Sequence, residues 1–208
     1  MASVSLKSIA KAYHGETAVN NFDLEVADGE LVVLTGPSGC GKSSVLRMIA
    51  GLEEITEGEL YIDGVLSNSI PPKDRDIAMM FQNFSLIRNK TVFENLAYGL
   101  RLRGLPSAEI DARIKEATDI MGLSELLDKK SKKLLLYQQK LVCLARALVR
   151  KLGIFLLDEP LAGLNGEPRE QIINEIIKLH SLLPVTFICA TTNQAEAQNF
   201  GGRVVEIT

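Results

Sequence analysis

Cysteine is scarce in this sequence, and its spacing excludes the commonest cysteine-based sites. The three cysteines, Cys40, Cys143 and Cys189, are odd in number and lie far apart. No two of them have the short spacing of a zinc site, and the set does not form a disulfide framework of the kind found in small secreted domains. A protein of the reducing cytosol fits this pattern best.

Long apolar runs are missing as well. No apolar segment approaches the roughly 18 residues that are needed to cross a bilayer. The N-terminal stretch MASVSLKSIAKAY has neither the apolar core nor the small-residue cleavage site of a signal peptide. The sequence therefore predicts a cytoplasmic protein without a membrane segment of its own, so any role at the membrane needs a partner.

An excess of basic charge is also absent. The chain has 23 Lys and Arg against 26 Asp and Glu, for a formal net charge of -3 at pH 7. Because the two signs are interspersed, the sequence predicts no basic field of the kind that concentrates nucleic acid. We expect no nucleic-acid partner.

The pattern that is present is that of an α/β protein. With 208 residues, of which 46% are hydrophobic, the chain is long enough to bury one sizeable core. Short β-branched runs alternate with helical patterns, which predicts βα units around a largely parallel sheet. Strands are expected at about 4–9, 22–26, 30–35, 60–63, 77–81, 154–157, 185–190 and 204–207. Helices are expected from 92 to about 148, with a break at 104–106 and Ser107 as the N-cap of a helix ending at Met121, and again at about 170–183.

The strongest motif is a phosphate-binding loop between an expected strand and an expected helix. One segment fits G-x-x-x-x-G-K-[ST] at every fixed position. Its glycines let backbone N–H groups wrap closely around a phosphate, and the following helix adds the positive end of its dipole. Lys42 is expected to reach the outer phosphates and to act in catalysis, and the Ser43 hydroxyl to hold Mg²⁺. The residues expected to contact the phosphates are Gly36, Pro37, Ser38, Gly39, Cys40, Gly41, Lys42, Ser43 and Ser44.

A second motif places two carboxylates at the end of an apolar strand. The run 154–157 is followed directly by Asp158 and Glu159. At the carboxyl end of a strand beside the phosphate loop, Asp158 is expected to hold the Mg²⁺ shell and Glu159 to polarise the attacking water as general base. An acidic turn exposed to solvent is the alternative.

Taken together, these motifs resemble the nucleotide-binding domain of ATP-binding cassette transporters, and most closely the ATPases of sugar importers. The resemblance covers nearly the whole chain and rests on GPSGCGKSS, MFQN, TVFENL, LARAL and FLLDEPLAGLN. It implies one domain, 1–208, with a P-loop NTPase core of mostly parallel sheet, an N-terminal antiparallel β part and a helical subdomain inserted at about 86–148. It also implies ATP and Mg²⁺ as ligands and transmembrane permease subunits as partners, at the inner face of the cell membrane.

The resemblance adds two site residues. In this family an aromatic residue before the second strand stacks on adenine, and Tyr13 stands at the matching place. A tyrosine that only packs is the alternative. Gln82 matches the glutamine that touches Mg²⁺ and the attacking water, which implies a metal and catalytic role; taken alone, a glutamine after a strand is more often a solvated loop residue.

The family pattern breaks where two subunits form a composite site. Family members hydrolyse ATP as head-to-tail dimers, in which one subunit's phosphate loop faces the other's Leu-Ser-Gly-Gly-Gln signature. Here that stretch, 134–138, reads LLLYQ. Leu135 lacks the serine hydroxyl, Leu136 and Tyr137 are bulky where glycine leaves space, and losing one preorganised donor costs on the order of 10²- to 10³-fold in rate. A shifted helix start, with other backbone N–H groups as donors, is the alternative.

Two more departures lie at the same interface. Thr192 stands where the family has a switch histidine, and a threonine does not carry a proton near neutral pH as histidine does. Asn165 replaces an interface aspartate and so loses its charge. Because the elements that hold nucleotide within one chain are intact, the sequence predicts retained binding with weakened hydrolysis.

Two functions follow from these observations. The leading one is an ATP-binding subunit that hydrolyses Mg-ATP weakly to drive transport, as a homodimer or as a heterodimer with an intact relative. The alternative is a non-hydrolytic nucleotide-binding regulatory module. Sugar-importer relatives continue past the position of Thr208 into further core elements and a β-rich domain, and the sequence leaves open whether this chain is a piece of a longer protein or a reduced one.

Overall fold

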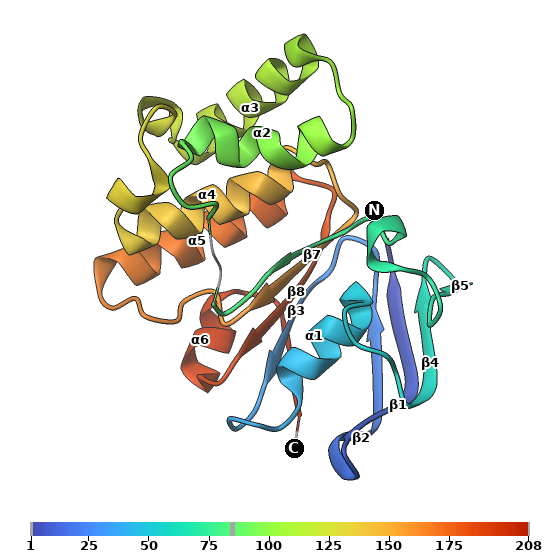
Figure 1. Ribbon diagram of the computed structural model, residues 1–208. Coiled ribbons are helices and arrows are strands. Elements are labelled where there is room, and N and C mark those ends of the chain that lie inside the picture. The colour runs from blue at the N-terminus through green and yellow to red at the C-terminus, as the bar shows by residue number, and fades with distance from the viewer. Residues whose placement is uncertain (1, 84–85, 208) are drawn as a thin grey trace. The chain divides into compact units, whose positions relative to one another are not determined.

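Nine strands and six α-helices make up the part of the chain that the computed structural model describes, residues 2–83 and 86–207 (Figure 1). The chain divides into two compact units. We call the first the strand unit, which comprises residues up to Gln82, 153–160 and those from Ile176 onward. The second, the helical unit, comprises residues 83–152 and 161–175. All the strands of the described residues belong to the strand unit.

A five-stranded parallel sheet forms the centre of the strand unit. Its order is β6-β7-β8-β3-β9, and every neighbouring pair is parallel. All residues of the three central strands are buried, which is typical of parallel strands covered on both faces. The expected α/β class with a mostly parallel sheet is therefore confirmed. The bounds are β3 Leu31–Thr35, β6 Ile77–Met80, β7 Ile154–Asp158, β8 Thr186–Thr191 and β9 Arg203–Glu206.

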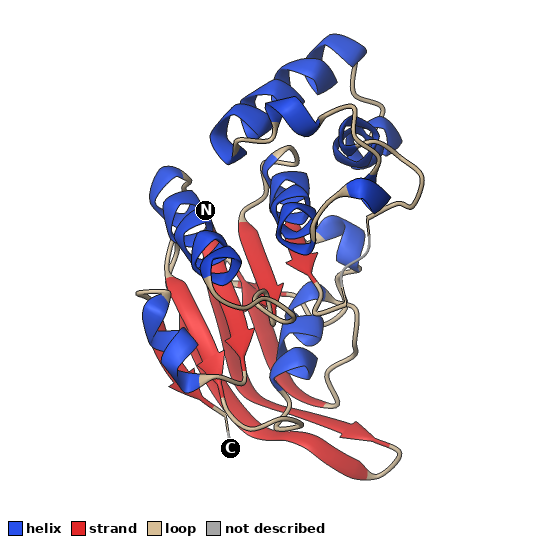
Figure 2. Ribbon diagram, turned by 90° about the vertical axis from the view of Figure 1, so that its left-hand side faces the viewer, coloured by secondary structure: helices blue, strands red, loops and turns tan. Residues whose placement is uncertain are grey.

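A four-stranded antiparallel sheet carries the N-terminal part of the strand unit, as expected (Figure 2). Its order is β2-β1-β4-β5, with bounds β1 Val4–Tyr13, β2 Glu16–Val26, β4 Glu57–Ile62 and β5 Val65–Leu66. A two-residue turn joins β1 to β2. His14 and Gly15 both have positive φ, 48° and 89°, as the tightest hairpin turns require. This turn fixes Tyr13 at the last position of β1, paired with Glu16.

Helix α1, Lys42–Ala50, packs its apolar face against the parallel sheet. Val45 and Leu46 belong to the same buried cluster as Leu34 of β3, Leu156 of β7 and Ile188 of β8. A second helix of this unit, α6 (Gln194–Asn199), contacts β3 and β8. The core therefore holds the start of α1, which carries the phosphate motif, against the ends of the central strands.

The end of α1 is held by a buried arginine. Arg75 is 6% exposed, and its guanidinium donates to the carbonyl oxygens of Met48 at 2.7 Å and Ile49 at 2.9 Å. It also donates to Ile70 O at 2.7 Å. Burial lowers the pKa of Arg75 from its ordinary value. A cation at a helix C-terminus satisfies orphan carbonyls and complements the dipole, so Arg75 ties α1 to the segment before β6.

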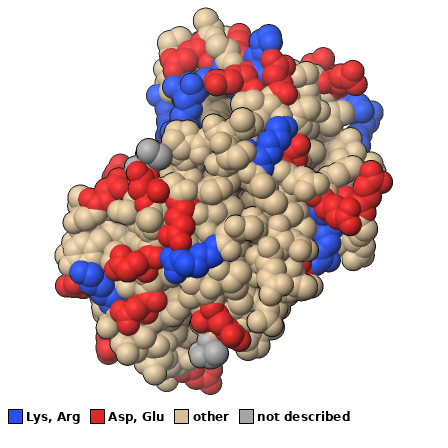
Figure 3. All heavy atoms as spheres, turned by 180° about the vertical axis from the view of Figure 1, so that it is seen from behind, with Lys and Arg blue, Asp and Glu red and all other residues tan. Residues whose placement is uncertain are grey.

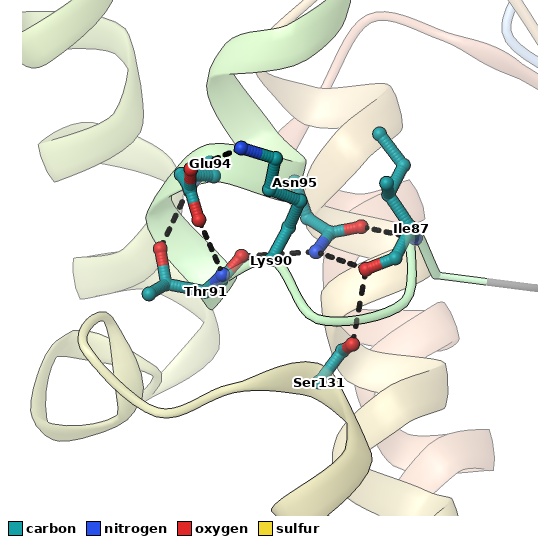
Figure 4. A network of polar contacts seen from close by, with 6 residues as sticks. All are labelled: Ile87, Lys90, Thr91, Glu94, Asn95 and Ser131. Carbon is teal, nitrogen blue, oxygen red and sulfur yellow. Dashed lines mark hydrogen bonds and ion pairs between the residues drawn. The ribbon is translucent and has the colours of Figure 1, made fainter.

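The helical unit contains α2 (Val92–Leu102), α3 (Ser107–Met121) and α4 (Leu136–Leu148). A polar network fixes the segment that leads into α2 (Figure 4). The buried Asn95 side chain accepts from Ile87 N at 2.7 Å and donates to Thr91 O at 2.9 Å, while Ser131 Oγ donates to Ile87 O at 3.1 Å. Thr91 and Glu94 complete a capping box at the start of α2.

Several expected boundaries differ from the observed ones. Ser107 is not an N-cap but the first residue of α3, because Pro106 already adopts the cap conformation and its carbonyl accepts from Glu109 and Ile110. Helix α5 spans Glu167–Leu182 and so begins three residues before the expected start, since Pro168 is tolerated in a first turn. The short elements β5 and α6 were not predicted. Three 3₁₀ turns complete the described chain: Pro72–Asp74, Ser124–Leu126 and Ser131–Lys133.

Replacing the buried arginine tests this account of α1. We expect Arg75→Ala to lower the free energy of unfolding by about 2–3 kcal/mol, because it removes the donor to the carbonyl oxygens of Ile49 and Ile70. Urea unfolding measures the change. The exposed Lys73→Ala, two residues earlier, is the matched control and should stay within about 0.5 kcal/mol of the wild type. Equal unfolding midpoints for Arg75→Ala and the wild type would contradict the assignment.

Candidate functional site

Apart from Tyr13, the expected site residues of the strand unit lie at or directly beyond one edge of the parallel sheet. Register pairs Thr35 with Thr191, and Asp158 with Ala190, so β3, β7 and β8 end at the same level. Met80 at the end of β6 pairs with Leu157. The carboxyl edge of an open α/β sheet is where such folds bind ligands. The residues that follow the four strand ends are Gly36, Gln82, Glu159 and Thr192.

The phosphate loop between β3 and α1 is shaped by glycines that no other residue can replace without displacing the backbone. Gly36 has φ 150°, and a Cβ there would lie 2.2 Å from the carbonyl oxygen of Ile207. Gly41 has φ 95°, and its Cβ would lie 2.5 Å from the carbonyl oxygen of Ala18. The two ends of the loop therefore lie close against Ile207, the residue after β9, and Ala18 of β2. Between them the loop residues Pro37, Ser38 and Gly39 are exposed.

The start of α1 presents uncapped backbone donors beside this loop. Gly41 is the N-cap and makes no side-chain cap hydrogen bond. The first N–H groups of a helix have no intrahelical partner and carry the positive end of the dipole, which suits an anion such as phosphate.

Lys42, the first residue of α1, is buried within the loop. Its ammonium donates to the carbonyl oxygens of Gly36 and Pro37, both at 2.8 Å, and lies 3.5 Å from the sulfur of Cys40. The structure thus places the positive charge in the loop itself, at hydrogen-bonding distance from the residues that begin it.

Ser43 and Asp158 meet beside the loop, as the motif spacing predicts. The Ser43 hydroxyl donates to Asp158 Oδ1 at 2.8 Å. Burial raises the pKa of Asp158, against the lowering effects of the Ser43 hydrogen bond and of the Arg47 and Lys42 charges. A hydroxyl and a carboxylate are hard oxygen donors, the type that Mg²⁺ prefers together with phosphate oxygens and water. The two residues therefore fit the expected metal.

Glu159 occupies a strained turn directly after β7. Its φ is 47°, a region that costs a non-glycine residue about 1–3 kcal/mol and that clusters at functional sites. Its N–H donates to the carbonyl oxygen of Ala190 at 2.9 Å, which fixes the peptide against β8. The side chain is half-buried. The sequence gives no signal for this conformation.

Gln82 and Thr192 lie at the same sheet edge but are not part of the Ser43–Asp158 hydrogen-bonded pair. Gln82 lies in a turn two residues past β6, and Thr192 is the first residue after β8; both are exposed. Within residues 2–83 and 86–207, neither side chain is hydrogen-bonded to Asp158 or Glu159. Their proximity to the site follows from strand register alone.

Tyr13 lies at the other side of the phosphate loop, next to α1. Its hydroxyl lies 3.1 Å from Ser44 Oγ and donates a hydrogen bond to Glu53. Arg47 Nη1 donates to the same carboxylate at 3.1 Å, and the Lys11 ammonium lies 5.0 Å from the centre of the Tyr13 ring. The sequence predicts a role for Tyr13, whereas no motif marks Glu53 or Lys11.

In the helical unit, the altered signature lies at the start of α4. Leu135 is the N-cap residue and makes no side-chain cap bond; its N–H donates instead to Gln138 Oε1 at 3.0 Å. Leu135 is 62% exposed and Leu136 40%. The first turn of α4 therefore presents apolar side chains to solvent. Asn165, also in this unit, is exposed.

A match to a known family model shows which family the chain belongs to. Residues 19–162 match the family model described as ABC transporter. The chain belongs to the ABC transporter family. Among solved ABC structures, the fold resembles the dimeric cassette MJ0796 bound to ADP and Pi, with a TM-score of 0.85 at 32% identity over 99% of this chain and 94% of that one. The nucleotide-binding fold that the motifs implied is therefore confirmed.

Curated members of the ABC family give the same result at higher identity. The chain is 49% identical to the oligosaccharides import ATP-binding protein MsmX of Bacillus subtilis over 206 residues, and 47% identical to the sn-glycerol-3-phosphate import ATP-binding protein UgpC of Burkholderia thailandensis. Each alignment covers 99% of this chain. It covers 56% and 57% of the two relatives, so the chain spans little more than half their length.

The buried Asp158 of this ABC cassette predicts a pH-dependent stability effect. The pKa of Asp158 is raised on folding, so its ionised carboxylate destabilises the folded state. This destabilisation is complete above the folded-state pKa and is lost as the pH falls from that pKa to the ordinary aspartate pKa. In buffer with chelator and without nucleotide, we expect Asp158→Asn to melt at a higher temperature than the wild type at pH 7.5. The difference should shrink as the pH is lowered into the carboxyl range.

Thermal unfolding between pH 7.5 and 4.5 measures this difference. Asp74→Asn, at an exposed aspartate of the same unit, is the matched control and should change the melting temperature little. A lower melting temperature for Asp158→Asn at pH 7.5 would show that the carboxylate stabilises the fold and would contradict this assignment.

Proposed function

We propose that this chain is the ATP-binding subunit of an ABC importer, and that it binds Mg-ATP well but hydrolyses it slowly. The observation that carries the proposal is the assembled phosphate site of the strand unit. There the buried ammonium of Lys42, the uncapped start of α1 and the Ser43–Asp158 pair lie within one short stretch of structure. MsmX and UgpC are both named as import ATP-binding proteins, which supports the proposal of an importer.

Each residue of the proposed site has a role that follows from its chemistry. The loop from Gly36 to Ser44 wraps the phosphates with backbone N–H groups, and Lys42 exchanges its two loop carbonyls for phosphate oxygens. Ser43, Asp158 and Gln82 would hold Mg²⁺, which would neutralise charge on the outer phosphates.

Glu159 is the proposed general base. It takes a proton from water as the water oxygen bonds to the γ-phosphorus and the bond to the bridging oxygen of ADP breaks. Its fixed peptide, held by Ala190, keeps the carboxylate at the sheet edge. Tyr13 supplies the ring on which the adenine base stacks.

The proposal of weak hydrolysis rests on residues at the start of α4 in the helical unit. In a dimer of the family type, the first turn of α4 would face a partner's γ-phosphate. Leu135 and Leu136 are exposed there and offer apolar groups in place of a hydroxyl and a close backbone donor. A homodimer would then have two poor composite sites. A heterodimer with an intact relative would have one good site, made of this chain's phosphate loop and the relative's signature.

The partners and location are proposed on the same basis. The helical subdomain, about 86–148 within the single cassette domain 1–208, is the part that would meet transmembrane permease subunits at the inner face of the cell membrane. Among the described residues, no helix is both long enough and apolar enough to cross a bilayer. On the face shown in Figure 3, basic and acidic side chains are interspersed, a distribution that gives no support to a nucleic-acid partner.

ATP turnover by the purified protein tests the proposal. We expect slow release of phosphate that depends on Mg²⁺ and disappears in Glu159→Gln, because glutamine does not accept the proton. Restoring the signature with Leu135→Ser, Leu136→Gly and Tyr137→Gly should raise turnover at least about 10-fold, since one donor to the transition state is worth 10²–10³. Leu102→Ser, at an exposed leucine of α2, is the control for loss of apolar surface and should leave turnover unchanged.

Two other outcomes of this experiment would count against parts of the proposal. Unchanged turnover in the triple variant would contradict the role of the signature. ATP binding without turnover in both the wild type and the triple variant would favour the second candidate, a non-hydrolytic nucleotide-binding module. That candidate draws its support from Thr192, which lacks a titratable ring at the sheet edge.

A further inference from the structure

The Tyr13 ring is held from several directions by side chains outside the phosphate motif. It ends strand β1, where the two-residue turn of His14 and Gly15 fixes its backbone. The residue is 37% exposed, so part of its surface is open to solvent while the rest lies against the protein. An aromatic residue at the end of a hairpin is ordinarily free to change rotamer, and here the hydroxyl and one face of the ring both have partners.

The hydroxyl is held by a carboxylate that is itself fixed. Tyr13 donates to Glu53, which lies just after the C-terminus of α1. Glu53 also accepts a hydrogen bond from Arg47 Nη1 at 3.1 Å in an ion pair, and its side chain is only 17% exposed. Burial raises the pKa of Glu53, an effect that the nearby Lys11 charge opposes. The acceptor is therefore anchored to α1 and does not move independently of it.

One face of the ring is covered by a cation. The Lys11 ammonium lies 5.0 Å from the ring centre, within the range of a cation–π interaction. The same ammonium donates to the carbonyl oxygen of Glu54 at 2.7 Å, which holds it in place. With the hydroxyl and one face both engaged, the ring plane has a single orientation relative to the phosphate loop.

We infer that Glu53 and Lys11 are positioning residues that fix the Tyr13 ring as a stacking platform for the nucleotide base. The inference rests on the proposed function, in which Tyr13 stacks on adenine. Preorganising an aromatic side chain removes the entropic cost of ordering it on binding. Because stacking uses the π-face and not the base edges, the platform would accept nucleoside triphosphates without distinguishing one base from another.

The position of Ser44 shows why the platform and the phosphate site form one recognition surface. Its hydroxyl lies 3.1 Å from the Tyr13 hydroxyl, and Ser44 belongs to the first turn of α1. Base and phosphate recognition are thus joined through α1, at its start by Ser44 and beyond its end by Glu53. Ser44 is itself a proposed phosphate contact, so the experiment leaves it unchanged.

Calorimetric binding of two ligands, Mg-ATP and Mg-tripolyphosphate, tests the inference, since tripolyphosphate has no base. We expect Glu53→Ala and Tyr13→Phe each to weaken Mg-ATP binding about 3- to 10-fold, the range for immobilising one side chain. Binding of Mg-tripolyphosphate should not change. Glu53→Gln keeps an acceptor oxygen and should retain most of the affinity. Glu54→Ala is the matched control, because it removes only an exposed carboxylate and keeps the backbone carbonyl that holds Lys11.

A double-variant cycle separates positioning from a general structural effect. Because the two changes break the same hydrogen bond, Glu53→Ala combined with Tyr13→Phe should bind Mg-ATP no more weakly than the weaker single variant. Lys11→Met, which removes the cation from the ring face, should weaken Mg-ATP and spare tripolyphosphate.

Three results would overturn the inference. Equal losses for Mg-ATP and tripolyphosphate in Glu53→Ala would show that Glu53 acts on the phosphate loop through Arg47. Unchanged Mg-ATP binding in both Glu53→Ala and Tyr13→Phe would show that the tether has no role in base recognition. Wild-type protein that binds neither ligand would overturn the proposed phosphate site as well, whereas a failure of the platform alone leaves tripolyphosphate binding intact.

Discussion

The close packing of the phosphate loop against its neighbours is the constraint on which the rest of the structure depends. Gly36 and Gly41 lie so near Ile207 and Ala18 that a side chain at either position would displace backbone. The loop thereby joins the parallel sheet to the antiparallel one, and the Ser43–Asp158 hydrogen bond ties it to β7. The loop residues proposed to contact phosphate, Lys42 among them, take their positions from this fixed backbone.

A division between intact and altered elements runs through the molecule. The groups of the strand unit that are proposed to bind nucleotide include the Lys42 ammonium within the loop and the Ser43–Asp158 pair beside it. The altered residues, chiefly Leu135 and Leu136 at the start of α4 and Thr192 after β8, are exposed, and in the proposed dimer the two leucines would face a partner's γ-phosphate. In the proposed function this division separates binding from turnover, and the identity of the second subunit would then be the main determinant of activity.

Much of the fold and the site could be predicted from the sequence because it is encoded locally. Glycine spacing and the strand that ends in Asp158 and Glu159 both have short patterns with a direct physical reason. What the sequence did not reveal depends on distant partners. The positive φ of Glu159 depends on β8, the cap on α1 comes from Arg75, and the partners of Tyr13 come from Lys11 and Glu53. Ser107 is not the N-cap of α3, because Pro106 takes that position. Helix propensity alone does not distinguish between these two neighbours.

The measurement that tests the central claim most directly is the affinity of the purified protein for Mg-ATP, compared between the wild type and Lys42→Ala by calorimetry. The account predicts that the wild type binds and that the variant loses about 30-fold or more in affinity, because a buried charge that pairs with phosphate is removed. Melting temperatures confirm that the variant is folded. Equal affinities would contradict the claim that this loop is the nucleotide site.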